Sequence, residues 1–295
     1  MNKKLLYVLI LFFFGSCAKV PENEDVIFSE NNSQTEIEKP TIQSDVVKRL
    51  ESPKPKGGEN NLIIVKNDDD YGVNYFLEWD CDKRAQRWTA YRMFKDNSVK
   101  TVERSGDDAW HEDETIPDEY RSVPEDYKSS GFDRGHMCPS ADRLQNKNMN
   151  RQTFCYSNMH PQYNVLNAGI WGDMEAKVRN WNRNEFRDTL YVVKGGTIDD
   201  KSQIFDFYTH GYSGLIIPKY FFMAVLCVKD DKYKAMGFWI EHRNSYSESE
   251  KKDLKQYAIS IDDLEDLTGI DFFYNLDSQI QDEVEKQLQT SDWEF

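Results

Sequence analysis

The sequence is most informative at residues 131–139, which read GFDRGHMCP. Glycines, an acid and a closing proline in so short a space are typical of a backbone that bends sharply and presents its side chains. This stretch contains His136, whereas the other four of the chain's five histidines lie in unremarkable contexts. A lone histidine is more often structural than catalytic, given its many roles. Because His136 shares a predicted turn with Asp133 and Arg134, we consider it a candidate catalytic residue.

A second group of polar residues lies downstream, on a predicted helix. Apolar residues recur at helical spacing from residue 166 to 183 and predict that helix. Asn167, Trp171 and Glu175 are four residues apart and would form one stripe on its surface. An amide and a carboxylate on one stripe, beside an apolar face, predict a polar site backed by a core. The alternative is that Asn167 only caps the helix, a role that asparagine often fills.

The remaining pattern predicts an α+β fold. Strand-like and helix-like runs are mixed without the regular period of parallel βαβ units. The polar stretch from residue 95 to 130 is longer than an ordinary connection, so we expect it to be functional or partly disordered. The predicted strands are 62–65, 73–77, 88–94, 153–159, 190–193, 215–217, 221–228 and 235–240, and further helices are predicted to begin at 261–265 and to span 278–288.

The N-terminus has the anatomy of an export signal. Two lysines precede the apolar run Leu5–Phe14, which is too short to span a bilayer and is followed by Gly15-Ser16-Cys17. Small residues immediately before a cysteine resemble a bacterial lipobox. We therefore expect residues 1–17 to be a lipoprotein signal peptide that ends at a lipidated Cys17, which would make the protein an exported, membrane-anchored lipoprotein on the periplasmic or cell-surface side. The alternative is a plain signal peptide that is cleaved elsewhere, with Cys17 discarded.

The rest of the chain divides by composition. Residues 18–60 are rich in Glu, Asn, Ser, Lys and Pro and predict a flexible tether. Residues 61–280 form the predicted folded domain, and residues 281–295 a polar C-terminal tail. Besides Cys17 the chain has four cysteines, an even number that permits disulfides in an exported protein without assigning their pairing. These are Cys81, Cys138, Cys155 and Cys227.

The charge of the chain limits how it could bind nucleic acid. Lys and Arg number 37 against 52 Asp and Glu, a formal net charge of −15. Proteins that bind nucleic acid through phosphates usually show a basic footprint. The charge balance therefore argues against broad electrostatic attraction to nucleic acid, and any nucleic-acid site must be a local basic patch on an acidic body.

Several stretches of the chain resemble the DNA/RNA non-specific endonuclease family, which includes secreted bacterial sugar-non-specific nucleases and mitochondrial endonuclease G. The motifs follow one another in the family's order and spacing, which is more specific than any one of them alone. The resemblance spans about residues 62–275 and implies a ββα-metal, or His-Me finger, nuclease fold with a central mixed or antiparallel sheet flanked by helices. The stretches are 88–91 (WTAY), 133–136 (DRGH), 157–162 (SNMHPQ), 166–175 (LNAGIWGDME), 216–218 (IIP) and 267–273 (LTGIDFF).

The resemblance also implies an activity. Family membership would make the protein a Mg²⁺-dependent endonuclease, with Mn²⁺ as a substitute metal, that hydrolyses DNA and RNA held through their phosphate backbones. His136 matches the general base that activates water, and Asn167 matches the single protein ligand of the metal. Glu175 matches the acid that orients water on the metal. These residue types suit the reaction, because a neutral imidazole can accept a proton and Mg²⁺ takes few protein ligands.

Five further positions are implied by the same resemblance. Arg104 falls where the family has an arginine that stabilises charge on the phosphate. Asn158 matches a residue that supports the site, and Asp133 and Arg134 belong to the central motif. Met223 is a departure, because many relatives have a lysine there, and we expect weaker phosphate binding nearby.

Two other functions compete with catalysis. The chain could be a catalytically inactive, nucleic-acid-binding surface lipoprotein of the same fold, or a structural surface protein without chemistry. Degenerate relatives would be expected to lose the base or the metal ligand, and this chain has both His136 and Asn167. The sequence therefore favours an enzyme, and leaves its DNA or RNA preference, biological role, membrane leaflet and oligomeric state open.

Overall fold

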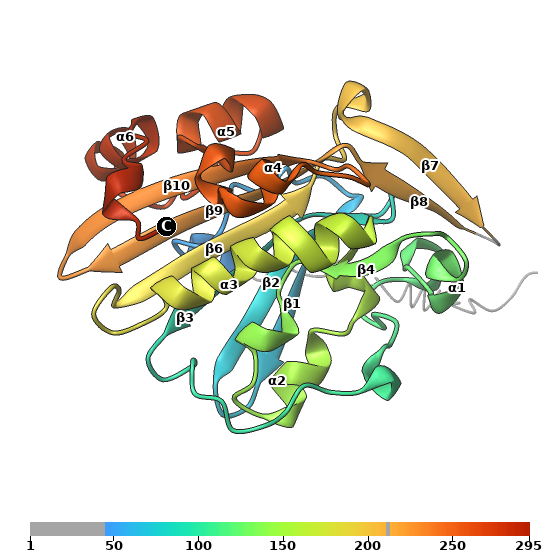
Figure 1. The fold of residues 1–295 in the computed structure, drawn as a ribbon. Coiled ribbons are helices and arrows are strands. Elements are labelled where there is room, and N and C mark those ends of the chain that lie inside the picture. The colour runs from blue at the N-terminus through green and yellow to red at the C-terminus, as the bar shows by residue number, and fades with distance from the viewer. Residues whose placement is uncertain (1–44, 211–212) are drawn as a thin grey trace, which may run out of the picture. The chain divides into compact units, whose positions relative to one another are not determined.

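The computed structural model describes residues 45–210 and 213–295. Its main element is a seven-stranded sheet in the order β1-β2-β3-β6-β9-β10-β11, in which all neighbouring strands are antiparallel (Figure 1). The predicted α+β class, with a central sheet flanked by helices, is confirmed. The strands are β1 (Asn61–Asp68), β2 (Gly72–Asp80), β3 (Ala85–Phe94), β6 (Thr189–Gly196), β9 (Tyr220–Lys229), β10 (Lys232–Glu241) and β11 (Ala258–Ile259).

Both faces of this sheet are covered. One face packs against α3 (Gly172–Trp181) through Met174 and its neighbours, and the other packs against α5 (Ile261–Thr268) and α6 (Ser278–Lys286) (Figure 1). Alternate residues of β9 therefore enter different apolar layers: Met223 lies on the α3 side and Ala224 on the α5 side. Two-sided burial explains why the sequence of β9 is continuously apolar instead of alternating.

A smaller unit carries the most informative part of the sequence. Strand β4 (Asp133–His136) pairs antiparallel with β5 (Met159–Gln162), and the chain then enters a wide π-type turn at Leu166–Trp171 that continues directly into α3. Gly169 breaks the helical backbone angles within this turn. The unit is thus two strands followed by a helix, and it contains the motif of residues 133–136.

The other elements are short. A second hairpin, β7–β8, extends from the edge of the structure (Figure 1). Its strands are β7 (Ile204–His210) and β8 (Ser213–Pro218), and the remaining helices are α1 (Pro124–Tyr127), α2 (Lys147–Gln152) and α4 (Glu248–Lys252).

The predicted strand at 153–159 is wrong. Residues Tyr156–Asn158 form a 3-10 turn, and β5 starts only at Met159. The cause is the Asn158 side chain, whose Nδ2 donates to the backbone carbonyls of Thr153 and Cys138, each at 2.9 Å. A side chain that bonds to nearby backbone offers the chain an alternative to a sheet ladder. The apolar residues of this segment are buried by a folded-back loop rather than by a strand.

The predicted tether is also wrong from residue 45 onward. Val46 is 4% exposed and packs into the apolar layer on the α5 side of the sheet. Tyr274 Oη and Asn275 Nδ2 donate to the backbone carbonyl of Val47, and Lys54 N donates to that of Asp271. Composition predicted a flexible arm here because few residues are apolar, but hydrogen bonds to the backbone of this segment hold it to the domain. Residues 18–44 lie outside the described part of the chain.

The polar C-terminal tail is docked rather than free. Trp293 is 2% exposed, and its ring centroid lies 4.7 Å from that of Trp181 on α3. The Trp181 indole also donates to the carbonyl of Glu294. The Phe295 ring packs on Trp181 as well, at 5.6 Å, so a few aromatic residues among polar neighbours anchor the tail through the apolar area that they bury.

All four cysteines of the described residues are free and buried. Burial raises the pKa of the Cys138 and Cys155 thiols to about 12, so both stay protonated at neutral pH. The even number of cysteines allowed disulfides, but the four described cysteines form none. The signal segment and Cys17 lie outside the described residues, and none of the described helices is long and apolar enough to cross a membrane.

Three carboxylates meet between α5 and α6. Asp262, Glu265 and Glu285 each place an oxygen within 4.8 Å of the others. Burial and the neighbouring acids raise the pKa of Glu265 to about 7 and that of Glu285 to about 8. In the folded protein Glu285 is therefore protonated at mildly acidic pH.

This cluster predicts a pH-dependent stability. Because the folded-state pKa of Glu285 lies above the ordinary value, its contribution is fully present below about pH 4.5 and is lost as pH rises through 8. We expect Glu285→Gln to raise the melting temperature at pH 8, by about 2–4 °C for each kcal/mol gained, and to leave it unchanged at pH 4. Glu283→Gln, at an exposed position of the same helix, is the matched control. Equal gains at both pH values would contradict the assignment.

Candidate active site

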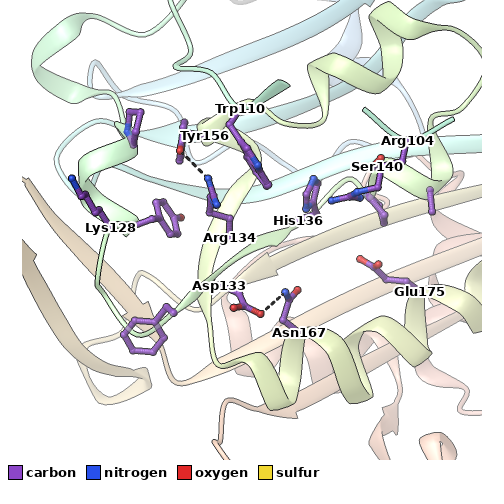
Figure 2. A pocket seen from close by; sticks show the side chains of 15 residues that line it. Arg104, Trp110, Lys128, Asp133, Arg134, His136, Ser140, Tyr156, Asn167 and Glu175 are labelled. Carbon is purple, nitrogen blue, oxygen red and sulfur yellow. Dashed lines mark hydrogen bonds between the residues drawn. The ribbon is translucent and has the colours of Figure 1, made fainter. Parts of the chain in front are cut away.

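A cavity of about 680 Å³ opens where β4, the π-type turn and the start of α3 meet the segment from residue 95 to 130 (Figure 2). That segment was expected to be functional or partly disordered; it is ordered and supplies part of the cavity wall. The lining residues are Arg104, Trp110, Pro124, Tyr127, Lys128, Phe132, Asp133, Arg134, His136, Pro139, Ser140, Ala141, Tyr156, Asn167 and Glu175.

His136 ends β4 and packs between two aromatic rings. Its ring centroid lies 5.4 Å from that of Trp110 and 5.3 Å from that of Phe154. The Arg134 backbone favours a proton on the imidazole, whereas Nε2 is buried and has no hydrogen-bond partner among the described residues. Nε2 is thus available as the proton acceptor of a neutral ring, with the proton assigned to Nδ1.

The electrostatic surroundings keep His136 neutral. Burial, together with the positive charges of Arg104 and Lys194, lowers the pKa of His136 to about 3. A cation is disfavoured in a poorly hydrated site that already holds other cations. The ring thus has its basic form at neutral pH.

Asn167 lies within the π-type turn and is fixed by Asp133. Its Nδ2 donates to Asp133 Oδ2 at 2.9 Å, and Asn164 Nδ2 donates to the same oxygen at 2.8 Å (Figure 2). The side chain makes no helix-capping hydrogen bond, so the capping interpretation is not supported. With its amide nitrogen held, Asn167 presents Oδ1 at the cavity wall, where no hydrogen bond engages it among the described residues. Amide oxygens of this kind are suitable ligands for hard cations such as Mg²⁺.

Glu175, two helical turns further along, is paired with a lysine that we did not predict. Lys194 Nζ on β6 lies 2.9 Å from Glu175 Oε1, and the Lys194 side chain is 0% exposed. Burial raises the pKa of Glu175, and the charge of Lys194 opposes that rise. A lysine inside the apolar run of β6 was the available signal, because buried lysines almost always have a partner. Met223, the departure from the family, is buried opposite Lys194 on β9 and does not line the cavity.

Two arginines reach the cavity over aromatic rings. The Arg104 guanidinium lies 4.7 Å from the Phe154 centroid, and that of Arg134 lies 4.2 Å from the Trp110 centroid. Such cation–π contacts orient the guanidinium group without neutralising its charge. Pattern reasoning missed Trp110 and Phe154, because single aromatics in irregular segments carry no periodic signal.

The cavity has the opposite charge balance to the whole chain. Three of its lining residues are cationic, Arg104, Lys128 and Arg134, against the two acids Asp133 and Glu175. The body of the protein is acidic, with a formal net charge of −15. The cavity is therefore the local basic patch that the sequence required of any nucleic-acid site.

Asn158 does not line the cavity but connects two of the strands that position the cavity residues. It is 0% exposed, accepts a hydrogen bond from Cys138 N at 2.8 Å, and donates to the Cys138 carbonyl. These bonds join the end of β4 to the start of β5. The predicted site residues are thus brought together, with Asn158 behind the wall and the other six on it.

Comparison with known proteins points to one family. The sequence profile of the DNA/RNA non-specific endonucleases matches residues 61–279. The chain is similar to a nuclease of Nostoc sp., 29% identical over 78% of this chain and 79% of the relative. It is also 30% identical to nuclease C1 of Cunninghamella echinulata, over 69% of this chain and 82% of the relative. In fold it resembles EndoG in the crystal structure of the EndoG/EndoGI complex, with a TM-score of 0.63, 22% identity, and coverage of 74% of this chain and 89% of that one.

The geometry around His136 predicts its protonation state. Because its pKa is lowered to about 3, the ring should stay neutral, with the proton on Nδ1, as pH falls from 8 to 5. Long-range ¹H–¹⁵N NMR of the metal-free protein measures this directly, and His136→Asn assigns the signal. A titration midpoint between pH 6 and 7 would contradict the description of the site.

Proposed function

Because the chain belongs to the family of DNA/RNA non-specific endonucleases, we propose that it is a divalent-metal-dependent enzyme that hydrolyses phosphodiester bonds of both DNA and RNA. The observation that carries the proposal is the convergence of three groups in one cationic cavity. Within the described part of the chain, they are an imidazole nitrogen and an amide oxygen that have no hydrogen-bond partner, and a carboxylate. Hydrolysis needs a base, a site for a cation and a means to order water, and these groups can supply all three.

The residues present fit a hard divalent cation. Asn167 would hold the metal through Oδ1, because Asp133 already engages its Nδ2. Mg²⁺ is the metal we propose, with Mn²⁺ as a substitute, because Mg²⁺ keeps most of its waters and needs few protein ligands. When bound, the metal would neutralise charge on the phosphate and on the leaving oxygen. Glu175 would accept hydrogen bonds from water inside the cavity.

His136 is the proposed base. Its Nε2 can accept the proton of an attacking water, which neutral imidazole does well near pH 7. The same cations that lower its pKa, Arg104 foremost, would be offset by the negative charge of a bound phosphodiester. Substrate binding would therefore raise the pKa of His136 and make it a stronger base in the enzyme–substrate complex.

The two arginines would bind and stabilise the phosphate. Arg104 and Arg134 stand on opposite sides of His136, each held over a ring. Guanidinium groups donate to phosphate oxygens in pairs and stabilise charge that builds up in the transition state. Contacts to phosphate carry no sequence information. We therefore propose cleavage without sequence preference, on DNA and RNA alike.

One experiment separates the roles of the base and the metal ligand. We expect His136→Ala to lower kcat in plasmid nicking by about 10²–10⁴-fold, the usual effect of losing positioned proton transfer. Asn167→Ala should instead raise the Mg²⁺ concentration needed, and excess metal should partly restore its activity by mass action. EDTA should abolish nicking by the wild-type protein.

The controls concern folding and additivity. Thermal melting of each variant shows whether the fold is retained, since Asn167 lies inside the π-type turn. The two defects should combine less than multiplicatively, because both residues serve one transition state. Near wild-type turnover by His136→Ala, or rescue of that variant by Mg²⁺ while Asn167→Ala is not rescued, would show the roles to be wrongly assigned.

We also propose that the enzyme is exported and anchored through Cys17. The support is the apolar run Leu5–Phe14 followed by Gly15-Ser16-Cys17. Mass spectrometry of the protein from its native membrane should find a diacyl- or triacyl-cysteine at the N-terminus, and Cys17→Ala should abolish this modification. A mature N-terminus beyond residue 17 without lipid would refute the anchor and leave the nuclease proposal intact.

A further inference from the structure

We propose that Lys194 is a positioning residue of the active site, which holds the Glu175 carboxylate at the cavity wall as an anion. The inference rests on the proposed function, because it gives Glu175 a task in the reaction. It concerns a residue that does not line the cavity and cannot touch the substrate. Its main action would pass through Glu175, and its charge also helps to keep His136 neutral.

The first observation is the isolation of the Lys194 charge. Its side chain is 0% exposed, and its Nζ bonds to Glu175 Oε1 at 2.9 Å. The ammonium also lies 5.4 Å from the Trp171 centroid and 5.8 Å from the Tyr91 centroid, and neither ring carries a compensating charge. A buried ammonium is costly unless it is paired. Glu175 and Lys194 therefore depend on each other for charge compensation.

The second observation is a balance of buried charge below the cavity. Asp142 lies near Glu175, is 4% exposed and pairs with Arg179 at 3.0 Å. Two carboxylates, Glu175 and Asp142, thus lie here with Lys194 and Arg179, and the buried Arg143 donates to the backbone carbonyl of Asp142. Without Lys194, Glu175 would face Asp142 and lose the one cation that is hydrogen-bonded to it. It would then take up a proton or turn away from the wall, and in either form it could no longer accept hydrogen bonds from water in place.

The third observation is the register of the sheet. Lys194 and Met223 are directly opposite on β6 and β9, on the same face and below α3. Side chains of such a pair start only about 4.5–5.5 Å apart. An ammonium carried by residue 223 could therefore reach the same carboxylate. The site requires a cation below Glu175, and the sheet offers two neighbouring positions that can provide it.

The test uses the full chain and compares kcat, KM and melting temperature. Lys194→Met should lower kcat about 10–100-fold, the usual effect of removing a partner that orients an active-site group, with little change in KM. Lys194→Met/Met223→Lys moves the ammonium across the strand pair and should recover most of that loss. Lys66→Met breaks a comparable buried pair, with Asp113 at 2.7 Å, outside the cavity wall. This control should lower the melting temperature and leave kcat unchanged.

A second readout does not depend on turnover. In the metal-free protein at pH 6, the infrared difference spectrum of Lys194→Met minus wild type should show an additional carbonyl band of a protonated carboxyl group, which Glu175→Gln added to Lys194→Met removes. Glu265 and Glu285, which are protonated at this pH in every variant, cancel in the difference. Lys194→Met/Met223→Lys minus wild type should lack the additional band. If the double variant does not fold, Lys194→Gln, which keeps a hydrogen-bond donor without the charge, should show the kcat loss instead.

The outcomes separate this inference from the proposed function. Wild-type kcat in Lys194→Met with a lower melting temperature would mean that the pair is only structural, and the inference would be overturned. So would a stable double variant as slow as Lys194→Met, or the absence of the carboxyl band. Failure of the wild-type protein to cleave DNA or RNA would instead refute the nuclease proposal.

Discussion

The active site depends on one buried amide. Asn158 engages both the N–H and the carbonyl of Cys138, and so ties the residues just beyond β4 to the approach of β5. This junction sets the relative positions of three side chains that line the cavity. His136 precedes it on β4, and β5 leads through the π-type turn to Asn167 and on to Glu175. Because each bond is made to backbone in a dry interior, substitution of the amide would leave polar groups buried without partners. The hydrogen bonds between Asn158 and Cys138 therefore fix the spacing between β4 and β5 more firmly than a surface contact could.

The balance of charge differs between the surface of the protein, the cavity rim and the layer of side chains below the cavity. The exterior is acidic, the cavity rim carries arginines over aromatic rings, and the layer below pairs Lys194 with Glu175 and Arg179 with Asp142. An acidic exterior repels polyanions at long range, although salt screens this within about 8–10 Å. Binding of nucleic acid would thus be governed by the short-range geometry of the cavity and not by the field of the whole protein.

Much of this structure could be predicted from the sequence, and the failures have physical causes. The strands from β1 to β10 that form the main sheet were found because two-sided burial leaves long apolar runs. The site residues His136, Asn167 and Glu175 were found because their motifs combine turn chemistry with helical spacing. The segment 153–159 failed because a single side chain, Asn158, redirected an apolar run into a turn. Val46 and Trp293 were missed because one well-buried residue anchors a polar segment without changing its composition. Lys194 was missed because its partner lies on another element, and pairing across elements is invisible to local patterns.

The π-type turn at Leu166–Trp171 has a consequence for how the chain can change in evolution. It widens the helix by about one residue per turn, and each residue of an α-helix corresponds to a rotation of about 100° around its axis. Asn167 and Glu175 are eight residues apart and both line the cavity, whereas eight residues of a regular α-helix would rotate them about 80° away from a common face. Seven residues of a regular helix would bring them back to one face. The extra residue and the widened turn can therefore be gained or lost only together, because either change alone would turn the amide away from Glu175.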